Sequence, residues 1–242
     1  MPAMTESPTL ETLRTWKPEA YGRKGTKAVA NPIVEPLWVG LRVLAGLDHG
    51  GGDGTAGTIG IVDEDGDPIL DRPEIEAALA VAARAESVIV DGYLTKQVAS
   101  DGTGLYVGPE KLTFDLGERM TQFFVGGRLA QTAKRAEAQR KFDEASSFGP
   151  GEVVSLVVID VLWLDGESLL DIPLLERKRQ LDSIIEESEL VRLGAYVLPP
   201  IETWIGSWRA VGFRDMSFRG ANSRYRPGAV GEDWATVPIP RR

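Results

Sequence analysis

The sequence has no cysteine and only one histidine, His49. The lack of cysteine excludes disulfide bonds, thiolate metal sites and cysteine nucleophiles. A single histidine also excludes a metal centre or a catalytic pair made from several histidines. His49 has no serine, aspartate or histidine partner that the sequence reveals, so we assign it no catalytic role.

Long apolar runs are absent as well. Residues 153–164, VVSLVVIDVLWL, are interrupted by Asp160 and end within about a dozen residues, whereas a membrane-spanning helix needs roughly 20. The N-terminal residues have neither the basic start nor the apolar stretch of a secretory signal. We therefore expect an intracellular, cytoplasmic protein with no membrane partner.

Positive charge is scarce except at one end of the chain. The 27 basic and 36 acidic residues give a net charge of −9, which repels polyanions such as DNA. Residues 204–242 are the exception, because their seven arginines and three acids give a local charge of +4. Any binding of phosphate or nucleic acid is therefore expected there, although pairing with local acids and carbonyl groups would also account for these arginines.

The 242 residues, of which 43% are hydrophobic, are enough for a large core. We expect a loosely held leader over residues 1–30 and one domain over residues 31–242. Strands are predicted around residues 33–47, 87–95 and 153–164, and helices around residues 73–85 and 173–188. This irregular mixture favours an α+β fold.

Residues 115–146 have a helical pattern with a break at Gly126 and Gly127. Its apolar residues at positions 116, 120, 123 and 124 lie on one face at helical spacing, and a basic stretch follows over residues 128–141. This pattern predicts a helical insertion that either packs on the core or binds a partner or nucleic acid.

Four segments in order carry a resemblance to a known family. They are EPLWVGLRVLAG (residues 35–46), VIVDGYL (88–94), VVIDVLWLDGESLLDIPLLERKRQLDSII (157–185) and ANSRYRPGAVGEDWATV (221–237). Together they resemble the adenylation domain of ATP-dependent DNA ligases, the bacterial repair type in particular. The resemblance implies a nucleotidyltransferase (ATP-grasp-like) fold of antiparallel sheets flanked by helices, and the chain leaves no sequence for the OB-fold domain that follows in such ligases.

The first segment departs from the family at its chemical positions. In the family a lysine amine attacks the α-phosphate of ATP and carries AMP, and an aspartate follows two residues later. Here these positions hold Leu37 and Val39, while Glu35 and Arg42 match the family. Because leucine has no lone pair, lysyl-AMP cannot form at Leu37.

The other segments depart in the same direction. Asp91 matches the family, but a metal-binding acid is replaced by Tyr93, a poor ligand for a hard cation. The aromatic residue that stacks on adenine is matched by Ile159. The remaining replaced positions, an acid and three lysines in the family, are Arg214, Arg219, Thr236 and Pro238.

These losses predict a catalytically inactive, ligase-like binding or scaffold protein with no metal and no cofactor, whose partner is another protein. Two alternatives stay open. One is an active ATP- and magnesium-dependent ligase with a relocated nucleophile, for which Lys96 is the best candidate. The other is a nucleic-acid-binding module that contacts phosphate through Arg42, Arg219, Arg224 and Arg226. Residues 35–46 would also suit an unrelated buried strand.

Two further motifs are weak. Residues 63–74 space their acids like a calcium loop, but Pro68 stands where the sharp turn needs glycine, so an acidic turn is favoured. Residues 48–57 are rich in glycine but lack the Gly-Lys-Ser/Thr ending of a phosphate loop. We expect a hairpin loop there.

Overall fold

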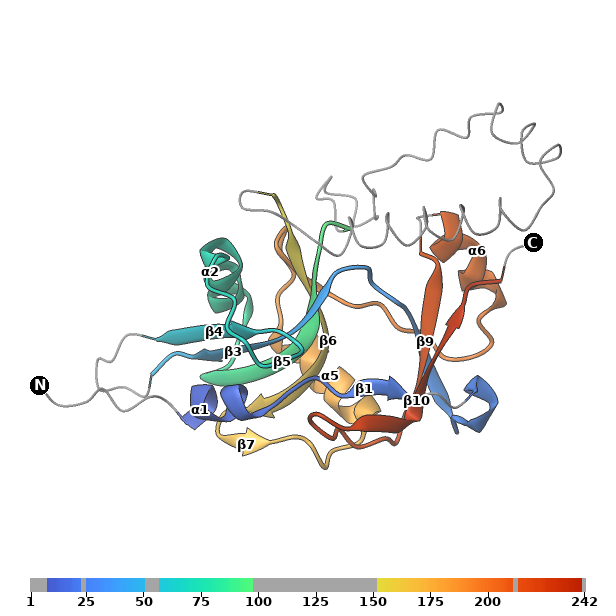
Figure 1. Ribbon diagram of the computed structural model, residues 1–242, viewed down its shortest axis with the longest axis horizontal. Coiled ribbons are helices and arrows are strands. Elements are labelled where there is room, and N and C mark those ends of the chain that lie inside the picture. Colours follow the sequence, from blue (N-terminus) through green and yellow to red (C-terminus); the bar gives the residue numbers. More distant parts are fainter. Residues whose placement is uncertain (1–7, 23–24, 51–56, 98–151, 211–212, 241–242) are drawn as a thin grey trace, which may run out of the picture.

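Two β-sheets face each other in the structure, a computed structural model that describes residues 8–22, 25–50, 57–97, 152–210 and 213–240. Figure 1 shows the larger sheet on the left and the smaller one on the right. The α+β class expected from the sequence is confirmed, because helices flank sheets whose strands are mainly antiparallel. No helix in these ranges is long and apolar enough to cross a membrane.

The larger sheet has six strands, with the order β4-β3-β5-β6-β7 and β8 paired to β6. Its strands are β3 Leu41–Asp48, β4 Thr58–Val62, β5 Ser87–Thr95, β6 Ser155–Leu164, β7 Glu167–Ser168 and β8 Val191–Leu193. All neighbours are antiparallel except β6 and β8. Every residue of β5 is buried, since both faces of this sheet are covered.

The smaller sheet has four strands, in the order β1-β10-β9-β2. They are β1 Ala20–Gly22, β2 Pro32–Pro36, β9 Asp215–Gly220 and β10 Val230–Pro238. β2 and β3 follow each other in the sequence but belong to different sheets. The segment of residues 37–40 therefore passes from one sheet to the other.

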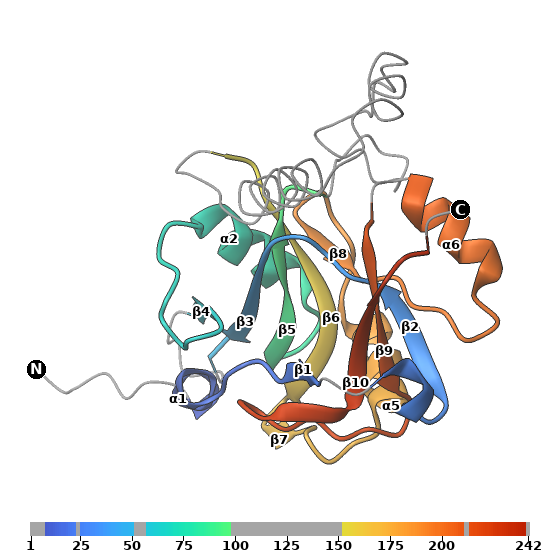
Figure 2. The same cartoon turned by 45° about the vertical axis from the view of Figure 1, so that its right-hand side comes forward.

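The helices are α1 Pro8–Thr15, α2 Pro73–Ala82, α5 Leu174–Ile184 and α6 Glu202–Ala210, with a 3-10 turn at Thr26–Ala28. α2 begins with proline, whose fixed φ suits the first turn of a helix. α5 begins directly after Pro173. In Figure 2, α6 lies at the outer side of the smaller sheet and α5 at the lower end of the space between the sheets.

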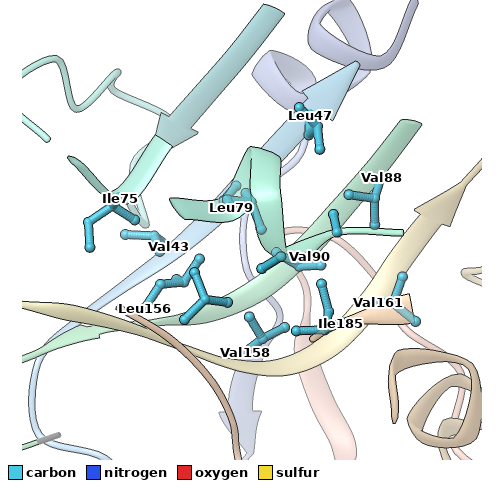
Figure 3. Close-up of a cluster of buried hydrophobic side chains, with 14 of the residues drawn as sticks. Val43, Leu47, Ile75, Leu79, Val88, Val90, Leu156, Val158, Val161 and Ile185 are labelled. Carbon is cyan, nitrogen blue, oxygen red and sulfur yellow. The ribbon is translucent and has the colours of Figure 1, made fainter. Parts of the chain in front are cut away.

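Four apolar clusters fill the layers of the described residues, the smallest of them around Ile33, Leu174 and Ala221. The largest joins one face of the six-stranded sheet to α2 and α5, and Figure 3 shows a close-up of it, with Val43, Leu79 and Val158 among the labelled side chains. A second lies between the sheets and includes Leu44, Ile89 and Trp234. A third packs α6 against the outer face of the small sheet. The alternation of Val43 and Leu44 between clusters reflects the two-residue period of a strand.

The expected leader is wrong for the described residues before Pro32. Leu10 and Leu13 of α1 are buried against β3 and β4, and β1 pairs with β10. The apolar residues of the short TLETLRTW helix thus close one end of the space between the sheets. α6 is not predicted from the sequence. The predicted insertion at residues 115–146 lies outside the described residues.

Of residues 63–74, for which an acidic turn is expected, residues 63–67 form that turn, while the last two already belong to α2. The Asp63 side chain accepts hydrogen bonds from the backbone N–H groups of Asp65 and Asp67, both at 2.9 Å. Ile69 then pairs with Ile61. The segment closes on itself as a turn after β4.

Candidate functional site: two buried ion networks

Strand register brings several predicted site residues onto one face of the small sheet. Glu35 of β2 lies opposite Ser217 of β9, which lies opposite Thr236 of β10. The Leu37 N–H donates to the Asp215 carbonyl at 3.0 Å and continues this ladder beyond β2. Glu35, Ser217 and Thr236 therefore lie on one face of this sheet.

Residues 37–40, however, are not part of a strand. Leu37, Val39 and the residues beside them are half-buried. The Val39 N–H donates to Gln97 Oε1, and Thr95 Oγ1 donates to the Val39 carbonyl, both at 2.6 Å. The alternative of an ordinary buried strand is therefore wrong for these residues, whose backbone is instead fixed to the end of β5.

Five buried charged residues form what we call the Glu35 network. Lys178 Nζ lies 2.5 Å from Glu35 Oε1, and Arg219 Nε donates to Glu35 Oε2 at 2.7 Å. Arg219 Nη1 donates to Asp160 Oδ2 at 3.2 Å. Arg177 donates from Nε and Nη2 to the two Asp160 carboxylate oxygens, both at 2.8 Å. No member is more than 4% exposed. The network joins β2, β6, β9 and α5.

A second group, the Asp91 network, lies beside it. Arg42 Nε and Nη2 donate to the two Asp91 oxygens at 3.1 and 2.7 Å. Tyr225 donates its hydroxyl to Asp91 at 2.8 Å, and Arg42 Nη1 donates to the Glu19 carbonyl at 2.6 Å. Trp234 separates the two networks, because its ring centroid lies 5.7 Å from the Arg42 guanidinium and 4.9 Å from that of Arg219.

Burial and pairing act against each other in these networks. Burial alone would raise the pKa of Asp160, but the charge and hydrogen bonds of Arg177, followed by the charge of Arg219, hold this pKa below its usual value. Burial lowers the pKa of Lys178, and Arg219 adds to this effect while Glu35 opposes it. The Glu35 network holds three cations against two carboxylates, so Lys178 is the member whose charge is easiest to remove.

Tyr93 and Ile159 are both buried on the large sheet. Burial raises the pKa of Tyr93 well above its ordinary value, and its ring lies 6.0 Å from the Arg42 guanidinium. Ile159 is the extra residue of a β-bulge, because Asp91 pairs with Asp160 and Gly92 pairs with Val158. Its carbonyl accepts a hydrogen bond from Arg219 Nη2 at 3.0 Å.

Arg42 and Arg219, for which a phosphate contact is predicted, direct their donors at the protein itself. All three guanidinium nitrogens of each are bonded to acceptors of the protein, and both side chains are buried. Arg224 and Arg226 are exposed, so for them phosphate contact stays a prediction. Arg214, Thr236 and Pro238 are exposed as well.

The described lysines are Lys17, Lys27, Lys96 and Lys178. Lys96 follows Thr95 on the end of β5, and its amine lies 2.8 Å from the Glu152 carboxylate. Leu94, two residues before Lys96, belongs to the cluster on the α2 side of the sheet. Of these four lysines, the one in the space between the sheets is Lys178.

Sequence reasoning missed Glu19, Asp160, Arg177, Lys178 and Tyr225. Two signals were available. Asp160 interrupts an otherwise apolar strand, and Arg177 and Lys178 stand between Leu174 and Leu181 on the helical face that becomes buried. In the described part of the chain, no three acidic or histidine side chains are grouped so that they could hold a metal ion.

No family model matches the sequence. Curated relatives nevertheless exist. The chain is 29% identical over 225 residues to a probable DNA ligase of Streptomyces coelicolor, which covers 90% of this chain and 36% of the relative. It is 31% identical over 88 residues to a DNA ligase of Thermococcus fumicolans, covering 35% of this chain and 16% of that protein. The chain thus spans about a third or less of the length of these relatives.

Solved structures agree with the sequence relatives. The ligase domain of M. tuberculosis LigD superposes with a TM-score of 0.58 at 18% identity, over 93% of this chain and 60% of that one. A mycobacterial DNA ligase D complexed with ATP and MES gives 0.59 at 17% identity, over 92% and 60%. The resemblance inferred from the motifs is confirmed: the chain is similar in sequence to DNA ligases and has the fold of their nucleotidyltransferase domain.

Proposed function

We propose that this chain is a ligase-like adenylation fold that forms no lysyl-AMP and that works by binding another protein. The observation that carries the proposal is the pairing of charges beside Leu37. Glu35, two residues away, is held by Lys178 and Arg219 rather than left free for a substrate. A side chain without a lone pair stands next to a carboxylate that is already neutralised.

ATP and magnesium fit the described residues of this face poorly. Binding of the ATP polyphosphate needs cationic side chains with free hydrogen-bond donors. The guanidinium nitrogens of Arg42 and Arg219 instead donate to acceptors of the protein. Magnesium needs carboxylate oxygens, whereas Tyr93 is a buried phenol and the Asp91 oxygens accept from Arg42 and Tyr225. We therefore expect a binding role without either cofactor.

The competing enzyme would need a different nucleophile. Lys178 has the lowered pKa that favours a nucleophilic amine, but its side chain is 1% exposed and bonded to Glu35. Lys96 is 23% exposed and bonded to Glu152. Neither amine is presented to a nucleotide, which supports the binding role over the enzyme.

The test is covalent labelling with α-labelled ATP and magnesium or manganese, read on a denaturing gel. We expect no label on the wild type. Leu37→Lys/Val39→Asp restores the amine and the acid, and Leu37→Met/Val39→Thr is the matched control of similar size without them. Label on the wild type would overturn the proposal, and its loss in Lys96→Met or Lys178→Met would identify the relocated nucleophile.

A further inference from the structure

A polar hollow lies beside Glu19, at the start of β10. Its volume is about 140 Å³, and two arginines, three acids and Trp234 contribute to its wall. The lining residues are Glu19, Asn222, Ser223, Arg224, Arg226, Glu232, Asp233 and Trp234. The Glu19 side chain is only 3% exposed, so its carboxyl group sits at the inner end of this hollow.

Glu19 connects the N-terminal segment to the loop of residues 222–229, which we call the arginine loop. Its Oε2 accepts a hydrogen bond from the Arg226 backbone N–H at 2.6 Å. Its own N–H donates to the Tyr225 hydroxyl at 3.0 Å. The Lys17 carbonyl accepts a further bond from Gly228 N–H at 2.8 Å. Arg224 and Arg226 point to solvent from this loop.

We propose that Glu19 is a proton-operated latch, whose protonated carboxyl group keeps the arginine loop closed on the N-terminal segment and whose ionisation favours release of that loop. The proposal does not rest on the absence of ligase chemistry. It concerns a surface at the outer end of the small sheet, and it would hold for an active or an inactive protein.

Whether a rise in pH opens or closes the arginine loop depends on the pKa of the Glu19 carboxyl group in the closed and the open state. Burial raises the pKa of Glu19 from 4.5 to about 7, although the Arg226 N–H and then the charges of Arg177, Arg226 and Arg42 act to lower it. When the loop opens, the carboxyl group returns to water and to its ordinary pKa. The open state then binds fewer protons between pH 4.5 and 7, so opening becomes up to about 300-fold more favourable as pH rises through this window.

Charged and titratable groups of several elements act on Glu19. Arg42 comes from β3, Arg177 from α5, and Tyr225 and Arg226 from the arginine loop, while Asp91 of β5 is connected to Glu19 through the Tyr225 hydroxyl. Glu232 and Asp233 of β10 share the hollow. Burial raises the pKa of Tyr225 well above 10, so its hydroxyl keeps its proton throughout the window.

The experiment is hydrogen–deuterium exchange of the whole chain between pH 4 and 8.5, with rates corrected for the intrinsic effect of pH. In the wild type, we expect protection of the peptide covering residues 222–231 to fall as pH rises, by up to about 300-fold, and to level off near pH 7. Glu19→Gln keeps the acceptor oxygen but cannot ionise, and should give a flat profile.

Asp233→Asn is the matched control, because it removes another acid of the same hollow. It should behave like the wild type. A flat wild-type profile, a profile that levels off near pH 4.5, or an unchanged profile in Glu19→Gln would each overturn the latch. If Glu19→Gln does not fold, the position of the wild-type plateau, compared with that of Asp233→Asn, still decides.

Discussion

Lys178 shows how single residues hold this site together. Its amine, Arg177 and Arg219 share two carboxylates in a space that water does not reach. Placing ions there is costly, and the cost is offset only while every ion keeps its partners. Removing one partner leaves a buried group without its hydrogen bond, whereas removing an exposed charge changes the free energy of unfolding little.

We predict that Lys178→Met destabilises the protein by about 1–3 kcal/mol, because buried Glu35 Oε1 loses its donor while Arg219 still pairs with Oε2. Lys27→Met is the matched control, since Lys27 is exposed, and should change stability by less than about 0.5 kcal/mol. Urea denaturation followed by tryptophan fluorescence measures both. Equal effects of the two substitutions would contradict the role given to the network.

At the scale of elements, strong periodicity made β5, β6, α2 and α5 predictable from sequence. α6 was not, because Gly206 and two tryptophans blur its helical pattern. The ion networks could not be predicted, because they depend on which strands become neighbours. The row of Glu35, Ser217 and Thr236 exists only once β9 lies between β2 and β10.

The passage from β2 to β3 gives an element-scale prediction. A Cβ at Gly40 would lie 2.1 Å from the Leu94 carbonyl oxygen, whereas a Cβ at Gly25 would meet nothing within 4 Å. Because backbone cannot move aside easily, we expect Gly40→Ala to cost about 1–3 kcal/mol and Gly25→Ala close to nothing. Thermal unfolding of both variants checks this; a stable Gly40→Ala would mean that residues 37–40 are held less tightly than their hydrogen bonds indicate.

At the scale of the whole molecule, the described residues that precede residue 98 and those that follow residue 151 are neighbours in space. Thr95 of β5 pairs with Ser155 of the antiparallel neighbour β6. Lys96 and Glu152, which come before and after residues 98–151 in the sequence, are joined by an ion pair of 2.8 Å. The last described residues of β5 and the first before β6 therefore lie side by side, at a distance that a short hairpin connection could span.

We predict that replacing residues 98–151 by about four Gly, Asn and Ser residues leaves the rest of the chain folded, because its two sheets, its four apolar clusters and both ion networks are formed by the residues that remain. Gln97 must be kept, since its side chain accepts from the Val39 N–H. The shortened chain should unfold in one cooperative transition and keep its near-ultraviolet circular dichroism. Non-cooperative melting with dye binding would instead mean that residues 98–151 supply part of the core, and the adenylation fold would then depend on its insertion for stability.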